Sequence, residues 1–265
     1  MTALQFVDTH IHLDDAQFDD DRDAVIDAAI AAGIVRLINI GYEPGVWETT
    51  LALADRRPEI GFVLGLHPGS TDKWSRETFA ALSDLVRSRR PLAIGEIGLD
   101  YYWTQENKAQ QRESFERQIE LALDLALPIV IHQRSAATDV RAVLSSAPQR
   151  LRVILHSFDG DPALADLAEE RGWFLGVGGL ATRRQAEELR DRLTRFPIDQ
   201  LLLETDAPYL IPAGIKERRN VPANIPIIAG RLAGLTGRPV DEIARVTTAN
   251  AERAFAMDVV AHARS

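Results

Sequence analysis

Two histidines separated by one residue are the first candidates for chemistry in this sequence. His10 and His12 lie in the run 6–13, whose residue types are typical of a buried strand. Because side chains alternate between the two faces of a strand, both imidazoles should point the same way, with Asp8 beside them. Neutral imidazole is a common ligand of divalent metals, so the pair indicates part of a metal site. For an isolated pair, two hydrogen-bonded structural histidines are the alternative.

Other histidines fall at or near the C-terminal ends of predicted strands. Five of the six in the chain share this position: His10, His12, His67, His132 and His156. Glu96 on the fourth predicted strand and Asp206 at the end of the eighth join them, whereas His262 lies in the polar C-terminal tail. Purely structural histidines would be scattered over helices and loops. The common position therefore favours one shared site.

The number of candidate ligands indicates more than one metal ion. Six residues form the predicted ligand set: His10, His12, Glu96, His132, His156 and Asp206. Four imidazoles and two carboxylates are too many for one tetrahedral ion that keeps a water position. They suit two divalent ions, zinc, magnesium or manganese, with Glu96 as the bridging carboxylate. Such a pair, about 3.5–4 Å apart, activates water and stabilises attacking and leaving oxygens.

The elements that must position these residues alternate regularly along the chain. Eight short apolar strands are predicted, over 6–13, 36–41, 62–67, 92–98, 128–132, 152–156, 173–178 and 201–206. Helices are predicted between them, including one over 183–195, and two more, 224–235 and 240–255, follow the last strand. This α/β alternation predicts parallel pairing and fits a (β/α)8 TIM barrel, in which the C-terminal ends of the strands form one face. A doubly wound open sheet competes, but no Gly-x-Gly-x-x-Gly motif follows the first strand.

Composition limits the possible classes of protein. A length of 265 residues, 46% of them hydrophobic, suits a single domain over 1–265. With a net charge of −9, an anionic substrate must be held by a local basic patch or by metals. The absence of cysteine excludes thiolate ligands and thiol nucleophiles. The N-terminus lacks signal-peptide features, and no apolar run approaches the roughly 18 residues that span a bilayer. We expect a cytoplasmic protein with no membrane partner and no obligate protein partner.

Eight motifs in order along the chain carry a family resemblance. They are Val-Asp-Thr-His-Ile-His-Leu (7–13), Gly-Leu-His-Pro (65–68), Gly-Glu-Ile-Gly-Leu-Asp-Tyr-Tyr (95–102), Pro-Ile-Val-Ile-His-Gln-Arg (128–134), His-Ser-Phe (156–158), Leu-Leu-Glu-Thr-Asp-Ala-Pro-Tyr (202–209), Arg-Asn-x-Pro (219–222) and Thr-Ala-Asn (248–250). Together they resemble the TatD-like metal-dependent hydrolases, which belong to the amidohydrolase-type barrels. The resemblance implies a divalent-metal hydrolase, with deoxyribonuclease activity in family members, and carries over the same six metal ligands. Val221 and Asp159 depart from the family pattern, which bears on substrate choice.

Three residues are predicted to be catalytic. Asp206 should bind one metal and orient or deprotonate the attacking water, and Glu96 should bridge the metals. His67 could donate to a substrate oxygen or act as a general acid, with a structural hydrogen bond as the alternative. Glu204, on the same strand face as Asp206, could accept a hydrogen bond from a ligand histidine or form a salt bridge inside the barrel.

Basic and aromatic residues near the expected mouth indicate how substrate is held. Four of them are predicted to bind phosphate: Arg134, Lys216, Arg218 and Arg219. Pairing of Arg134 with a carboxylate and a merely solvated loop over 208–226 are the alternatives. The aromatic run 100–103 could stack a base or serve as a packing anchor, and a helix N-terminus after Gly178-Gly179, with Arg183-Arg184, could add phosphate contacts.

These features favour a deoxyribonuclease that hydrolyses phosphodiester bonds of DNA from single-stranded or frayed ends. The same metal chemistry on a small ester, an amide or a cyclic phosphodiester is the first alternative. A binding protein that retains metal without turnover is the second.

Overall fold

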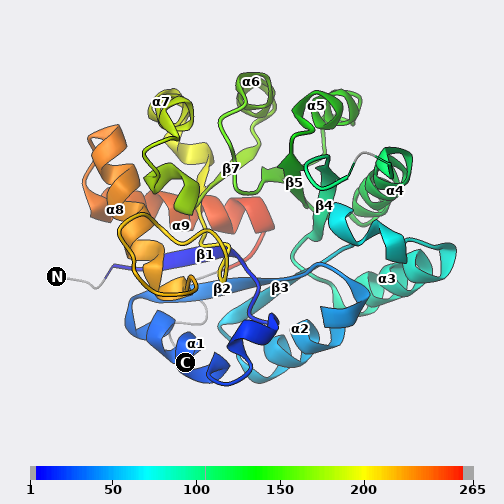
Figure 1. Ribbon diagram of the computed structural model, residues 1–265, viewed down its shortest axis with the longest axis horizontal. Helices are drawn as coiled ribbons and strands as arrows, with labels where there is room; N and C mark the ends of the chain where they lie inside the picture. The colour runs from blue at the N-terminus through cyan, green and yellow to red at the C-terminus, as the bar shows by residue number, and fades with distance from the viewer. Residues whose placement is uncertain (1–3, 105, 259–265) are drawn as a thin grey trace.

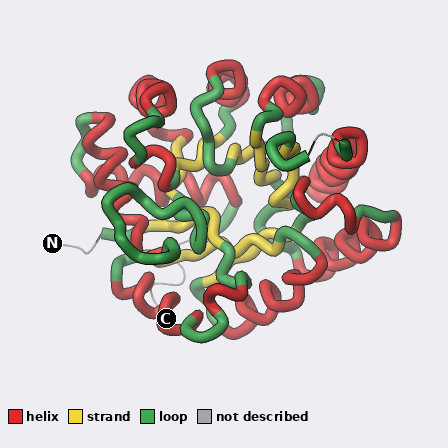
Figure 2. The backbone as a smooth tube through the Cα atoms, viewed as in Figure 1, coloured by secondary structure: helices red, strands yellow, loops and turns green. Residues whose placement is uncertain are grey.

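The computed structural model describes residues 4–104 and 106–258, so His262 lies outside the described residues. One parallel sheet contains eight strands in the order of the chain. They are β1 (Phe6–Ile11), β2 (Ile34–Gly41), β3 (Ile60–Leu64), β4 (Ile94–Asp100), β5 (Ile129–Arg134), β6 (Val153–Leu155), β7 (Phe174–Val177) and β8 (Leu201–Leu203). The strands surround a common centre and helices lie outside them (Figures 1 and 2). The predicted TIM barrel is confirmed, and the open sheet is excluded.

Nine α-helices occur within the described residues. They are α1 (Arg22–Ala31), α2 (Pro44–Arg56), α3 (Arg76–Arg89), α4 (Lys108–Leu125), α5 (Ala137–Ser145), α6 (Pro162–Arg171), α7 (Glu187–Arg195), α8 (Ile225–Thr236) and α9 (Val240–Phe255). The predicted start of the seventh helix at residue 183 is wrong. Arg183 has extended backbone angles and ends a short 3-10 helix, Gly179–Thr182, so α7 begins later and offers no N-terminus at that position. No helix within 4–104 or 106–258 has the length and apolar character needed to cross a membrane.

Hydrogen bonds between β1 and the segment after β8 bring the two ends of the sheet together. The main-chain N–H of Asp206 donates to the carbonyl of His10 at 2.9 Å, and that of His12 donates to Ala207 at 2.9 Å. Asp8 is buried there and accepts from the Thr205 N–H at 2.9 Å. Asp8 therefore links β1 to the segment after β8 and does not belong to the groups of potential metal ligands. Closing the barrel at this point places Asp206 beside His10 and His12.

The barrel interior is apolar at the N-terminal end of the strands. Val7, Ile38 and Val130 belong to one buried cluster with Ala254 and Phe255 of α9. Burial of this surface is favoured by the hydrophobic effect, and α9 covers that end of the barrel. The polar side chains therefore gather at the opposite end, where the strands lead into their following loops.

Candidate metal centre and active site

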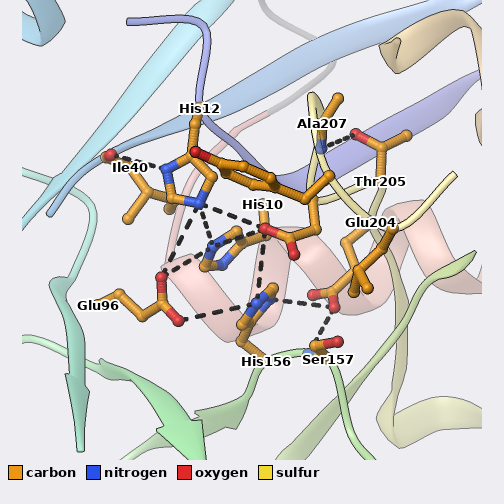
Figure 3. A network of polar contacts seen from close by, with 12 residues as sticks. His10, His12, Ile40, Glu96, His156, Ser157, Glu204, Thr205 and Ala207 are labelled. Carbon is orange, nitrogen blue, oxygen red and sulfur yellow. Dashed lines mark hydrogen bonds and ion pairs between the residues drawn. The ribbon is translucent and has the colours of Figure 1, made fainter. Parts of the chain in front are cut away.

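His10 of β1 and His12, the residue directly after that strand, converge on carboxylates, as the strand pattern predicts. Both are buried, and their Nε2 atoms lie 3.3 Å apart. Nε2 of His10 is 3.3 Å from Oε2 of Glu96, and Nε2 of His12 is 3.3 Å from Oδ1 of Asp206. The imidazole of His156 stacks on that of His10 with ring centroids 3.4 Å apart (Figure 3). A pair of isolated structural histidines does not describe this arrangement.

Glu96 lies between two groups of imidazoles. Its Oε2 faces His10 and His12, while its Oε1 lies 2.8 Å from Nδ1 of His132 and 3.8 Å from Nε2 of His156. Three groups of potential ligand atoms result: His10–Glu96–His156, His10–His12–Asp206 and His67–Glu96–His132. All six predicted ligands are thus brought together, and the carboxylate of Glu96 reaches both sides, as a bridging ligand must.

Three histidines of the predicted ligand set have an oxygen atom near the ring nitrogen that points away from the cluster. Nδ1 of His12 lies 3.3 Å from the carbonyl of Ile40, and Nε2 of His132 lies 3.1 Å from Oδ2 of Asp100. Nδ1 of His156 lies 3.1 Å from Oε1 of Glu204 without hydrogen-bond geometry, so the hydrogen bond predicted for Glu204 stays a prediction. An oxygen acceptor keeps the proton on the outer nitrogen and leaves the inner nitrogen free to bind a metal. The donor set and its orientation therefore fit divalent ions.

His67 differs from the four histidines predicted to be metal ligands. Its Nδ1 accepts a hydrogen bond from the N–H of Gly69 at 2.9 Å, which leaves the proton of a neutral ring on Nε2. That Nε2 lies 3.8 Å from Oε1 of Glu96. Burial and the neighbouring His132 lower the pKa of His67 to about 3. The ring is therefore neutral and directs an N–H donor towards the cluster.

Opposing charges determine the protonation of the cluster. Burial disfavours charged imidazoles, yet contact with Asp206 raises the pKa of His12 to about 9. Burial likewise opposes charge on His132, but hydrogen bonds with Asp100 and Glu96 raise its pKa to about 9. Burial would raise the pKa of Glu96, but the surrounding imidazoles hold it well below its ordinary value. Protons thus balance the carboxylates in metal-free protein, and divalent ions would replace them.

Asp100 is a site residue that the sequence reasoning included only in an aromatic run. It lies four residues after Glu96 on β4. Residues at an even spacing on a strand share one face, so the sequence could have indicated that Asp100 lies beside Glu96. Gly98, at φ +138°, allows β4 to approach β5: a Cβ at this position would lie 2.0 Å from the carbonyl oxygen of His132. The side chain of Gln111 accepts from the N–H of Asp100 at 2.8 Å and donates to its carbonyl at 2.9 Å.

Replacing Asp100 with asparagine should weaken metal binding. The substitution removes the charged acceptor that orients His132, and loss of such a contact costs roughly 10–100-fold in metal affinity or activity. Calorimetric titration of metal-free protein would measure the change. Asp139→Asn is the matched control, because it makes the same change at the acceptor of the Tyr101 hydroxyl. Parental affinity in Asp100→Asn would contradict a role in positioning His132.

A cavity of about 650 Å³ opens above the cluster. His12, His132, His156 and Asp206 line it. Aromatic and charged residues of the rim also line it, and they include Tyr42, Trp103, Arg134, Asp159, Arg183 and Tyr209. Asp159 accepts from Nε2 of Gln133 at 2.8 Å, whereas Val221 packs against the core and does not line the cavity. Of the two departures from the family pattern, only Asp159 therefore faces this space.

The predicted phosphate-binding residues occupy different positions. Arg134 lines the cavity, but Lys216, Arg218 and Arg219 do not. The guanidinium of Arg219 donates to Asp21 at 2.6 Å and lies over the ring of Phe18. These contacts attach the loop after β8 to the segment before α1, which indicates a structural role for Arg219.

Fold and site together define a metal-dependent hydrolase with an amidohydrolase-like barrel. The profile of the TatD related DNase family matches residues 7–256, and the chain belongs to this family.

Known relatives resemble the chain over nearly its full length. The metal-dependent hydrolase YabD of Bacillus subtilis is 33% identical, with 94% of this chain and 98% of YabD covered. The 3′-5′ ssDNA/RNA exonuclease TatD of Erwinia tasmaniensis is 35% identical, with 94% of this chain and 98% of the relative covered. The crystal structure of YJJV, a TatD homologue from Escherichia coli, superimposes with a TM-score of 0.90 at 30% identity, covering 97% of this chain and all of YJJV.

Proposed function

We propose that the protein is an exonuclease that hydrolyses phosphodiester bonds at single-stranded ends of DNA, with two divalent ions held by the six ligand residues. One observation carries the proposal. The carboxylate of Glu96 lies between two groups of imidazoles at the base of a cavity whose rim carries Arg134 and exposed aromatic rings. The Erwinia relative, a 3′-5′ ssDNA/RNA exonuclease, supports the same substrate class.

The residues of the site have distinct roles in this reaction. Bound divalent ions would acidify water and polarise the phosphoryl group. Oδ1 of Asp206, which lies 3.3 Å from Nε2 of His12, would orient the attacking water and accept its proton. The Nε2–H of His67 donates a hydrogen bond to a phosphate oxygen, because its other nitrogen is occupied by Gly69. Arg134 supplies positive charge at the rim.

The depth of the site favours flexible ends. Glu96, His10 and His12 are buried, and the aromatic and charged rim stands above them. A single strand can direct one terminal phosphodiester into such a cavity, whereas the interior of a rigid duplex cannot.

A panel of substrates under several divalent metals tests the proposed function. End-labelled single-stranded DNA and RNA should be shortened progressively, frayed duplexes more slowly, and closed circular DNA not at all. Equal cutting of circular and linear DNA would reject the exonuclease assignment. Turnover confined to a small ester, an amide or a cyclic phosphodiester would favour the first alternative. Metal binding without turnover of any substrate would identify a binding protein.

Arg134→Ala should make binding of single-stranded DNA less dependent on salt. On single strands, each phosphate contact contributes about 0.7 to the slope of the logarithm of the binding constant against the logarithm of the salt concentration. The loss of one contact should therefore make this slope shallower by about 0.7. Filter binding across a salt series would measure it. Arg112→Ala on α4 removes an exposed arginine paired with Glu116 and should leave the slope unchanged. Equal slopes for Arg134→Ala and the parent would contradict the phosphate contact.

A further inference from the structure

An aromatic segment at the rim divides into an anchor and an exposed pair. Tyr101 is 8% exposed, and its hydroxyl donates to Asp139 at 2.9 Å, so this ring is a packing anchor. The next two rings differ, since Tyr102 is 57% exposed and Trp103 is 73% exposed. Trp103 also lines the cavity above the candidate metal centre. The exposed indole is thus available to a ligand that enters the cavity.

The exposed pair is held in a defined arrangement. The rings of Tyr102 and Trp103 meet edge to face with centroids 4.9 Å apart. The guanidinium carbon of Arg134 lies 3.7 Å from the Tyr102 centroid and 5.2 Å from that of Trp103. The N–H of Tyr102 donates to Oδ1 of Asp100 at 2.9 Å, while Oδ2 of Asp100 contacts His132. One carboxylate therefore connects the aromatic segment to the ligand set.

The guanidinium of Arg134 is oriented by these rings and retains its hydrogen-bonding capacity. Within residues 4–104 and 106–258, no side-chain hydrogen bond or ion pair engages it. Stacking against the ring fixes the plane of a guanidinium while its N–H groups at the edge stay available to an oxyanion. An oriented cation beside an exposed indole has the two features that a nucleotide requires, a partner for phosphate and a face for the base.

We propose that the indole of Trp103 is the stacking platform for one unpaired nucleobase of the substrate strand, with Arg134 contacting a phosphate of the same segment. The inference rests on the proposed function and specifies how that site holds its substrate. Base–aromatic stacking tolerates all bases, because each has a π-face. The site should therefore prefer unpaired strands without strong sequence preference. A paired base, already stacked within a duplex, cannot occupy the platform.

Binding of labelled oligonucleotides tests this platform independently of turnover. Parental protein should lose roughly tenfold in affinity when one nucleotide near the 3′ end is replaced by an abasic residue. Trp103→Ala should bind the normal strand roughly tenfold more weakly and be insensitive to the abasic replacement, whereas Trp103→Phe should retain most of the affinity. Trp74→Ala is the matched control, because Trp74 packs on Phe79 in a separate groove.

The remaining outcomes of these binding and hydrolysis measurements would overturn either the stacking platform or the nuclease assignment. Parental affinity in Trp103→Ala, with oligonucleotides still hydrolysed, would overturn the platform and leave the proposed function standing. An equal loss on normal and abasic strands would also overturn it, since the effect would then be structural. Absence of oligonucleotide binding by the parent would reject the platform, and absence of hydrolysis alone would reject only the nuclease assignment.

Discussion

Replacing Asp206 with asparagine is expected to reduce kcat about a thousandfold while preserving the fold. The substitution removes a negative ligand oxygen and the proton acceptor for water. An interaction of this kind supplies several kcal/mol in the transition state, and about 4 kcal/mol corresponds to a thousandfold change in rate. Asparagine suits the position because Asp206 has φ +56°, a conformation that Asp and Asn tolerate better than most residues.

Steady-state kinetics on an end-labelled single strand would measure the effect, and thermal unfolding would confirm that the variant is folded. Asp166→Asn provides a control, since Asp166 is exposed on α6 and pairs with Arg192. A folded Asp206→Asn enzyme with the parental kcat would show that Asp206 has no part in activating water.

Removal of metal is expected to abolish turnover, and reloading should restore it with two ions per chain. Metal must displace protons from the cluster, because contacts with carboxylates raise the pKa of His12 and His132 to about 9 despite the opposing effect of burial. Affinity should therefore increase as pH rises from 6 towards 9, since fewer protons then compete for the same nitrogens. Binding near neutral pH should release protons into the buffer.

Elemental analysis after metal loading would give the stoichiometry, and calorimetry in buffers of different ionisation enthalpy would count released protons. Glu96→Gln should lower the number of tightly bound ions. The neutral amide lacks the negative charge that Glu96 provides to the imidazoles on both of its sides. Glu116→Gln, on the exposed face of α4, should bind as the parent does. A limit of one ion per parental chain at saturation would reject the bridged pair.

The sequence by itself determined the positions of the ligand residues. The two-residue period of a strand placed His10 and His12 on one face, and parallel alternation placed the C-terminal ends of distant strands on one rim. Those two regularities bring Glu96, His132 and Asp206 together without knowledge of any contact. They are properties of the backbone, so residue spacing reveals them.

The tertiary structure alone decided what individual side chains touch. The N–H of Gly69 determines which nitrogen of His67 keeps its proton. Gln111 forms hydrogen bonds with the main chain of Asp100. Arg219 donates a hydrogen bond to Asp21, which is 198 positions away in the sequence. The helix expected from residue 183 likewise begins later, because extended backbone at Arg183 ends the preceding 3-10 helix. Such features depend on distances between segments that only folding brings together, and neither spacing nor composition encodes them directly.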